Sequence, residues 1–222
     1  DLIDIDAYRG DCSPGDYERH LDELRRGNPS ARDVACLAAR GAAGLVADVL
    51  DGAPLGSDDA LEARRRRRNA ASALAGLEGD DAIGALCARL GDARAEAGEV
   101  VALVLGVLPD PAASTCIRDT LRDVGPLTHR AAAAALRQRA ARGLFPVDEA
   151  WGLTSTLLGS ADPESRLAGL SVAPLFAGDT ALPAVRPLQD DADPEVATAA
   201  TEALEAIARV RRTDQLRPDR GP

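Results

Sequence analysis

Residues 193–204 read DPEVATAATEAL, which is typical of a capped helix start followed by a buried helical stripe. Asp193 at the N-cap can accept a hydrogen bond from an unpaired backbone N–H. Pro194 at the next position has no N–H to leave unpaired. Apolar residues then recur every three to four positions, from Val196 to Ile207. The stretch therefore predicts a helix that buries one side against a neighbour.

The register of this stretch occurs six times along the chain. Counted from a fixed anchor position, the six copies begin at Arg32, Arg68, Glu99, Arg130, Arg166 and Ala197. Successive anchors are 36, 31, 31, 36 and 31 residues apart. The residue three positions after each anchor is always small: Ala35, Ala71, Ala102, Ala133, Gly169 and Ala200. A period of this length is the signature of stacked repeats, so the sequence predicts an all-α solenoid of about six antiparallel helix pairs.

Each repeat is expected to contain two helices and a tight turn. The expected repeats are residues 14–41, 42–79, 80–109, 110–143, 144–178 and 179–210. Residues 1–13 are expected to form a polar lead-in, and residues 211–222 a charged tail. The small residue of each register marks a close helix contact, since a larger side chain would separate the two backbones. Pro174 is expected to kink or end its helix because it lacks an N–H.

The charge composition excludes some partners. The chain has 36 acidic and 26 basic residues, with a formal net charge of −10, and every basic residue is arginine. An acidic chain without lysine is typical of a salt-adapted, high-GC organism. This charge also argues against binding to nucleic acid, which needs a basic face. No apolar run is long enough to predict a membrane span, and a cytoplasmic protein is expected.

The cysteines give no sign of a metal site or a disulfide framework. They are Cys12, Cys36, Cys87 and Cys116, and no two of them form a CxxC pair. Three lie at apolar positions of helical patterns, where a free cysteine behaves as a small buried apolar residue. Free thiols are therefore expected, in agreement with a reducing cytoplasm.

Two stretches resemble the short, bilin-lyase-like subclass of HEAT repeats. Residues 162–169 (DPESRLAG) and residues 193–204 match the pattern Asp-Pro-x-Val-Arg-x-x-Ala-x-x-Ala-Leu, and the resemblance extends over about residues 14–210. The chain departs from the pattern where Ala197 replaces the usual arginine and where Glu99 reverses its charge. The resemblance implies a right-handed superhelix with the second helices on its concave side. It also implies a scaffold or adaptor, because only a minority of the family are lyases or chaperones of tetrapyrrole attachment.

The strongest candidate for a binding site is a run of five arginines beside the longest expected loop, followed in rank by the only tryptophan. These residues are Arg64, Arg65, Arg66, Arg67, Arg68 and Trp151. Five successive residues span about 400° of a helix, so they cannot share one solvated face. The run is either an anion site for an acidic partner, since guanidinium groups bind carboxylates in a bidentate manner, or a solvated helix start paired with nearby carboxylates. Trp151 either anchors a partner or fills the junction between repeats.

No catalytic motif is recognisable, and no catalytic, cofactor-binding or metal-binding residue is assigned. His20 is expected on a helix surface and His129 near a turn, in different repeats. The sequence therefore favours a non-enzymatic protein-interaction scaffold without a cofactor, which uses the concave face of the solenoid. A bilin-lyase-type enzyme or chaperone is the first alternative, although the few aromatic residues are scattered. A HEAT-like nucleic-acid repair protein is the second, and the net charge opposes it.

Overall fold

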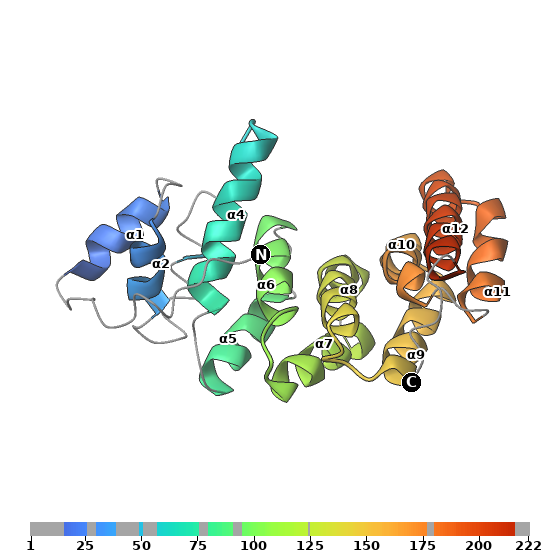
Figure 1. The fold of residues 1–222 in the computed structure, drawn as a ribbon, viewed down its shortest axis with the longest axis horizontal. Helices are drawn as coiled ribbons and strands as arrows, with labels where there is room; N and C mark the ends of the chain where they lie inside the picture. Colours follow the sequence, from blue (N-terminus) through green and yellow to red (C-terminus); the bar gives the residue numbers. More distant parts are fainter. Residues whose placement is uncertain are drawn as a thin grey trace. The chain divides into compact units, whose positions relative to one another are not determined.

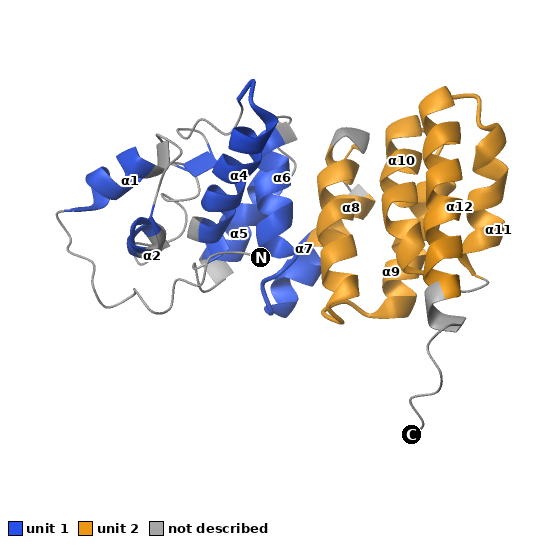
Figure 2. Cartoon of the chain, turned by 45° about the horizontal axis from the view of Figure 1, so that its top comes forward, with its two compact units in different colours: residues 1–116 blue, residues 117–222 orange. Residues whose placement is uncertain are grey.

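The structure is a computed structural model that describes residues 16–25, 30–38, 49–50, 57–75, 80–90, 95–123, 125–176 and 180–215 (Figure 1). All regular elements among these residues are helices. The chain divides into two compact units, residues 1–116 and 117–222, and each is described by itself (Figure 2). The chain is thus an all-α solenoid of stacked helix pairs, as the repeat period predicts.

In the first unit the second helix of each repeat packs on the second helix of the next. The helices are α1 (Tyr17–Arg25), α2 (Ala31–Ala38), α4 (Ala60–Ala75), α5 (Asp80–Leu90) and α6 (Ala95–Leu105). Helix α4 contacts both α2 and α6, while α1 and α5 pack on α2 and α6 respectively. Helix α7 (Pro111–Asp123) contains the boundary between the two units.

The second unit repeats this arrangement. Its elements are α8 (Pro126–Ala141), α9 (Val147–Leu158), α10 (Pro163–Val172), the 3-10 turn η3 (Ala173–Leu175), α11 (Ala181–Val185), the 3-10 turn η4 (Arg186–Asp190) and α12 (Pro194–Gln215). Helices α8, α10 and α12 form a row in which each contacts the next (Figure 2). Helix α10 ends at Val172, immediately before the 3-10 turn that contains Pro174, which confirms the expected effect of this proline.

All six anchors lie in the second helices of their repeats, and the small residues of the register are buried. This holds for Ala71, Ala102, Ala133, Gly169 and Ala200, while the side chain of Ala35 lies outside the described part. The contact is tight at Gly169, where a Cβ atom would lie 3.0 Å from both the Leu157 Cβ and the Leu158 backbone nitrogen. The prediction of close helix contacts in this register is therefore confirmed for the described positions.

The Asp-Pro pairs cap helices as expected. Asp162 Oδ2 accepts a hydrogen bond from the Ser165 N–H at 2.7 Å, and Pro163 is the first residue of α10. Asp193 Oδ1 accepts a hydrogen bond from the Glu195 N–H at 2.9 Å. The corresponding pair at residues 28–29 lies outside the described residues. Each capping carboxylate satisfies a backbone donor that the helix itself cannot.

The cysteines differ from the expectation, because Cys87 and Cys116 form a disulfide that joins α5 to α7. Their Cα atoms are 5.8 Å apart, as disulfides require. Cys36 is also disulfide-bonded, and Cys12 lies outside the described residues. The prediction of free thiols is wrong for the described cysteines. The two cysteines are 29 residues apart, close to one repeat, so they occupy neighbouring first helices. This spacing was the signal in the sequence.

His20 also differs from the expectation, since it is buried instead of lying on the surface. Its Nδ1 atom donates a hydrogen bond to Asp33 Oδ1 at 2.5 Å, while the Ser30 N–H and hydroxyl donate to Asp33 Oδ2 at 2.7 and 2.6 Å. The Asp33 N–H in turn donates to Ser30 Oγ, which completes a reciprocal cap of α2. Burial raises the pKa of Asp33, but the hydrogen bonds from Ser30 and His20 outweigh it and the net pKa is lowered.

Carboxylates that hold helix starts make the fold sensitive to acid. The pKa of Asp162 is lowered mainly by the hydrogen bond from the Ser165 backbone, and that of Asp191 by the backbone of Asp193 and then by Arg166. A group whose pKa is lower in the folded than in the unfolded state stabilises the fold above its unfolded pKa. That stabilisation is lost as the pH falls through the folded pKa.

We therefore expect the free energy of unfolding to decrease as the pH falls from about 5 towards 3. Replacing Asp162 by asparagine keeps a side-chain oxygen that can cap α10 but removes the titrating group. The Asp162→Asn variant should therefore lose less stability than the wild-type chain over this interval. Urea unfolding at a series of pH values measures the difference. The general effect of neutralising the acidic surface is the same in both proteins, so parallel pH profiles would contradict the role given to Asp162.

Candidate functional site

The five arginines are the α4 anchor Arg68 and the four residues before it. Helix α4 begins at Ala60, eight positions before its anchor Arg68, whereas α6 begins four positions before Glu99. The helix start is fixed by Asp59, whose Oδ1 accepts hydrogen bonds from the N–H groups of Leu61 and Glu62. Leu61, at the very start, is 76% exposed. The extra turn, residues 60–63, therefore precedes the arginine run, and the run itself holds the register positions of the first turn of α6.

The structure divides the five arginines into two groups. Arg66 is half-buried and paired with Glu62 one turn earlier. Arg67 is also half-buried, and its Nε lies 2.9 Å from Glu99 Oε2 on α6. Arg64, Arg65 and Arg68 are exposed. Two arginines therefore pair with nearby carboxylates and three remain on the surface, while an anion site for an acidic partner stays a prediction.

The three exposed arginines share one side of the helix. At 100° per residue, positions 64, 65 and 68 fall within an arc of about 100°. Within the described residues, no carboxylate lies within ion-pair distance of these three side chains. We call Arg64, Arg65 and Arg68 the α4 arginine face. Three guanidinium groups on one side of a helix can bind the carboxylates of an acidic segment.

The arginines at the anchor positions serve a structural role where the structure describes their partners. Arg166 Nη1 donates hydrogen bonds to the carbonyls of Ser160 and Ala161, and its Nη2 lies 2.8 Å from Asp191 Oδ1. Arg130 lies 3.0 Å from Glu164 on the next second helix. Glu99, which stands at the anchor position in place of arginine, forms an ion pair with Arg67 of the preceding repeat. These pairs join residues about one repeat apart, as expected where each repeat contacts its neighbours.

Trp151 lies in the packing between α9 and the last repeat. Its ring meets Phe176 edge-on, with centroids 5.3 Å apart, and both side chains pack against the buried cluster around Val196 and Ala200. Trp151 is half-buried. This position agrees with a residue that fills a junction between repeats, while a role in partner binding stays a prediction.

One group of serine, histidine and aspartate escaped the sequence analysis. Ser165 Oγ lies 2.9 Å from both Asp162 Oδ2 and His129 Nδ1, and Ser165 is buried. The serine stands between the other two, whereas a nucleophilic triad needs the histidine in the middle. The single hydroxyl proton goes to Asp162, so the arrangement ties α8 to the capped start of α10. The spacing of 36 residues between His129 and Ser165 equals one repeat and was the available signal.

The described residues include no group of three histidine, cysteine or acidic side chains placed to hold a metal ion. None of the helices within the described part is both long and apolar enough to cross a membrane.

Comparisons with known proteins found similarity only at the level of folded structures. No family model matches the sequence, and no curated protein matches it. One similar structure is a designed armadillo repeat protein in complex with the peptide (KR)4, with 17% identity, a TM-score of 0.46, and coverage of 93% of this chain and 99% of that chain. Another is a computationally designed armadillo repeat protein for modular peptide recognition, with 18% identity, a TM-score of 0.40, and coverage of 85% and 98%.

Proposed function

We propose that this chain is a non-enzymatic protein-interaction scaffold that binds an acidic segment of its partner at the α4 arginine face. The observation that carries the proposal is that Arg64, Arg65 and Arg68 are exposed together on one side of α4. A net charge of −10 makes a local basic face unusual in this chain. An acidic segment gains from pairing with this face, whereas the acidic parts of the surface repel it.

The aromatic side chains favour this function over tetrapyrrole attachment. Trp151 and Phe176 pack on each other, and Phe145 is buried with the guanidinium of Arg118 over its ring. A flat tetrapyrrole needs exposed aromatic or apolar faces to stack on, and these three rings are used in packing. Binding to the phosphate backbone of nucleic acid is opposed by the acidic balance.

The repeat class, habitat and location are parts of the same proposal. The Asp-Pro caps and the small residue of each register support a HEAT-type array, and the acidic, lysine-free composition supports a salt-adapted source. A cytoplasmic location stays a prediction, but it no longer has the support of free thiols, because Cys87 and Cys116 are bonded.

A binding measurement with a defined peptide tests the arginine face. The probe is a fluorescent oligoglutamate peptide, and its affinity is measured by anisotropy at about 0.05 M salt, where screening is weak. Replacing Arg64, Arg65 and Arg68 by serine should weaken binding by on the order of tenfold, because each exposed charge pair contributes up to about 1 kcal/mol.

The matched control removes the same charge elsewhere. Arg122, Arg137 and Arg142 are also exposed, on or just after α7 and α8 in the described structure. Their triple serine variant should bind the peptide as the wild-type chain does. Equal weakening in both triple variants would show that only the net charge matters, and the proposed site would then be wrong.

A further inference from the structure

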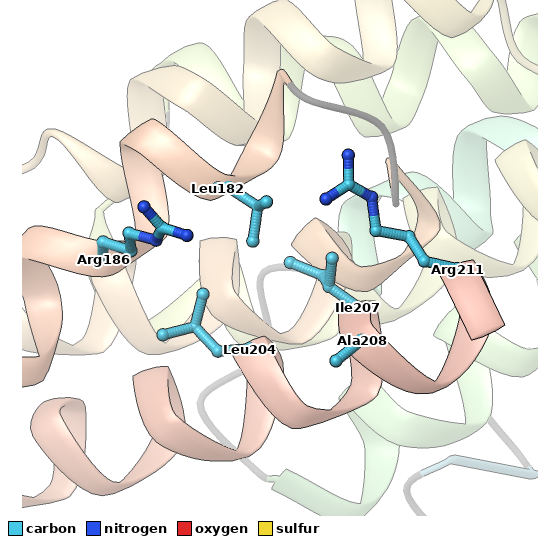
Figure 3. Close-up of a pocket in the computed structure, with 6 residues that line it drawn as sticks. All are labelled: Leu182, Arg186, Leu204, Ile207, Ala208 and Arg211. Atoms are coloured by element: carbon cyan, nitrogen blue, oxygen red, sulfur yellow. The ribbon is translucent and has the colours of Figure 1, made fainter.

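The last repeat has an open groove between its two helical segments. The groove has a volume of about 350 Å³ and is lined by Leu182, Arg186, Leu204, Ile207, Ala208 and Arg211. Leu182 and Arg186 come from α11 and η4, and the other residues come from α12. The aliphatic side chains lie between the two arginines, which stand at opposite ends of the group (Figure 3). The groove is therefore apolar in its middle and cationic at both ends.

The repeat register shows what normally covers such a surface. In the fifth repeat, Trp151, Ala173 and Phe176 hold the register positions that Leu182, Leu204 and Ile207 hold in the sixth. These three residues pack against the buried cluster that α11 and α12 contribute. The elements that carry or adjoin them, α9 and η3, contact α11. The groove is thus the face on which a following pair of helices packs within the array.

The charges around the groove select the occupant. None of its lining residues is acidic, although the chain as a whole carries a net charge of −10. Besides Arg211, the same end of α12 carries three exposed residues, Arg209, Val210 and Arg212. Two guanidinium groups at the ends of an apolar groove complement an apolar side chain with carboxylates on either side of it. The volume lies near the lower end of the range for binding pockets, about 300–1,000 Å³, so it suits one or two aliphatic side chains.

We propose that this groove binds an acidic amphipathic helix of a partner protein. Leucine-sized side chains of that helix lie on Leu182, Leu204 and Ala208, and its glutamates or aspartates pair with Arg186 and Arg211. Such a helix takes the position that α11 takes on the fifth repeat, and it uses the helix-in-groove mode of recognition. The site shares no residue with the α4 arginine face and lies in the other compact unit, so either site can exist without the other.

The test uses a labelled peptide of about 16 residues, long enough to form a helix, with leucines at helical spacing and glutamates beside them. Binding is measured by fluorescence anisotropy at about 0.1 M salt. The Arg186→Glu/Arg211→Glu variant should bind at least about tenfold more weakly than the wild-type chain. The control variant Arg137→Glu/Arg142→Glu makes the same charge change at exposed residues outside the groove and should bind normally. A peptide with glutamine in place of glutamate should lose affinity similarly.

A second variant guards against a folding defect in the first. Ala208 is exposed, so Ala208→Glu places a carboxylate in the groove without disturbing the core, and it should weaken binding as well. Absence of peptide binding to the wild-type chain, or equal binding by all variants, would overturn the proposal. Concentration-dependent self-association that the groove variants abolish would overturn it too, because the occupant would then be a second copy of the chain.

Discussion

Replacing Gly169 by leucine is expected to lower the free energy of unfolding by about 1–3 kcal/mol, the usual effect of overpacking a close contact. A Cβ atom at this position would lie 3.0 Å from the Leu158 backbone nitrogen and 3.1 Å from the Leu158 Cγ. Since one of these neighbours is backbone, the contact cannot be relieved by a side-chain rotation alone. Helices α9 and α10 must move apart, and every further atom of the leucine side chain increases the displacement.

The control for this prediction is another helical glycine in the same unit. Gly152 lies within α9, it is exposed, and a Cβ atom there would meet nothing within 4 Å. Gly152→Ala should therefore stabilise the chain by up to about 1 kcal/mol, because alanine favours helix more than glycine does. Urea and thermal unfolding of the two variants measure both effects. A Gly169→Leu variant as stable as the wild-type chain would show that the register does not mark a close contact.

The fold could be predicted because its period is carried by residues that have little freedom. A small residue at Ala133 or Gly169 is required wherever two backbones approach, so it recurs at each repeat and remains visible without any alignment. The caps at Asp162 and Asp193 are local, since donor and acceptor lie two or three residues apart. Local and periodic features of this kind are legible in a single sequence.

Contacts between helices could not be predicted with the same reasoning. The disulfide between Cys87 and Cys116, the ion pair between Arg67 and Glu99 and the burial of His20 beside Asp33 each depend on how two helices are rotated against each other. Their separations of about one repeat were visible in two of the cases. The separation alone does not fix which sides of the two helices meet.

The candidate sites also combine features that the sequence predicts with features that depend on how the helices pack. The geometry of a helix was sufficient to predict that the five arginines cannot share one face, but the selection of Arg64, Arg65 and Arg68 as the exposed members needed the positions of Glu62 and Glu99. The groove on the last repeat was not recognisable at all. Leu182, Leu204 and Ile207 hold positions that pack against the following repeat in the fifth repeat, so they resemble core residues until the absence of a covering helix pair within the described residues is seen.

Removing the disulfide between Cys87 and Cys116 is expected to have the largest effect on stability of any change considered. The bond closes a loop of 29 residues, and the chain-entropy relation for a loop of this length gives about 3–4 kcal/mol. The Cys87→Ala/Cys116→Ala variant should therefore unfold at a clearly lower urea concentration than the oxidised wild-type chain. The first unit, which contains both cysteines, should show the loss.

The control is to compare the wild-type chain and the double-alanine variant again in the presence of a reductant. Reduction cuts the Cys87–Cys116 bond in the wild-type chain, and it cuts the bond of Cys36 in both proteins. The difference in unfolding free energy should then shrink to the small packing effect of the buried Cys116 side chain. A difference that persists in the reductant would assign the whole effect to packing, since the cross-link is absent from both proteins. Thiol titration of the unfolded, unreduced wild-type chain decides whether the bond forms at all. Four reactive thiols, the full cysteine count, would exclude the bond. That result would also restore the argument for a reducing cytoplasm.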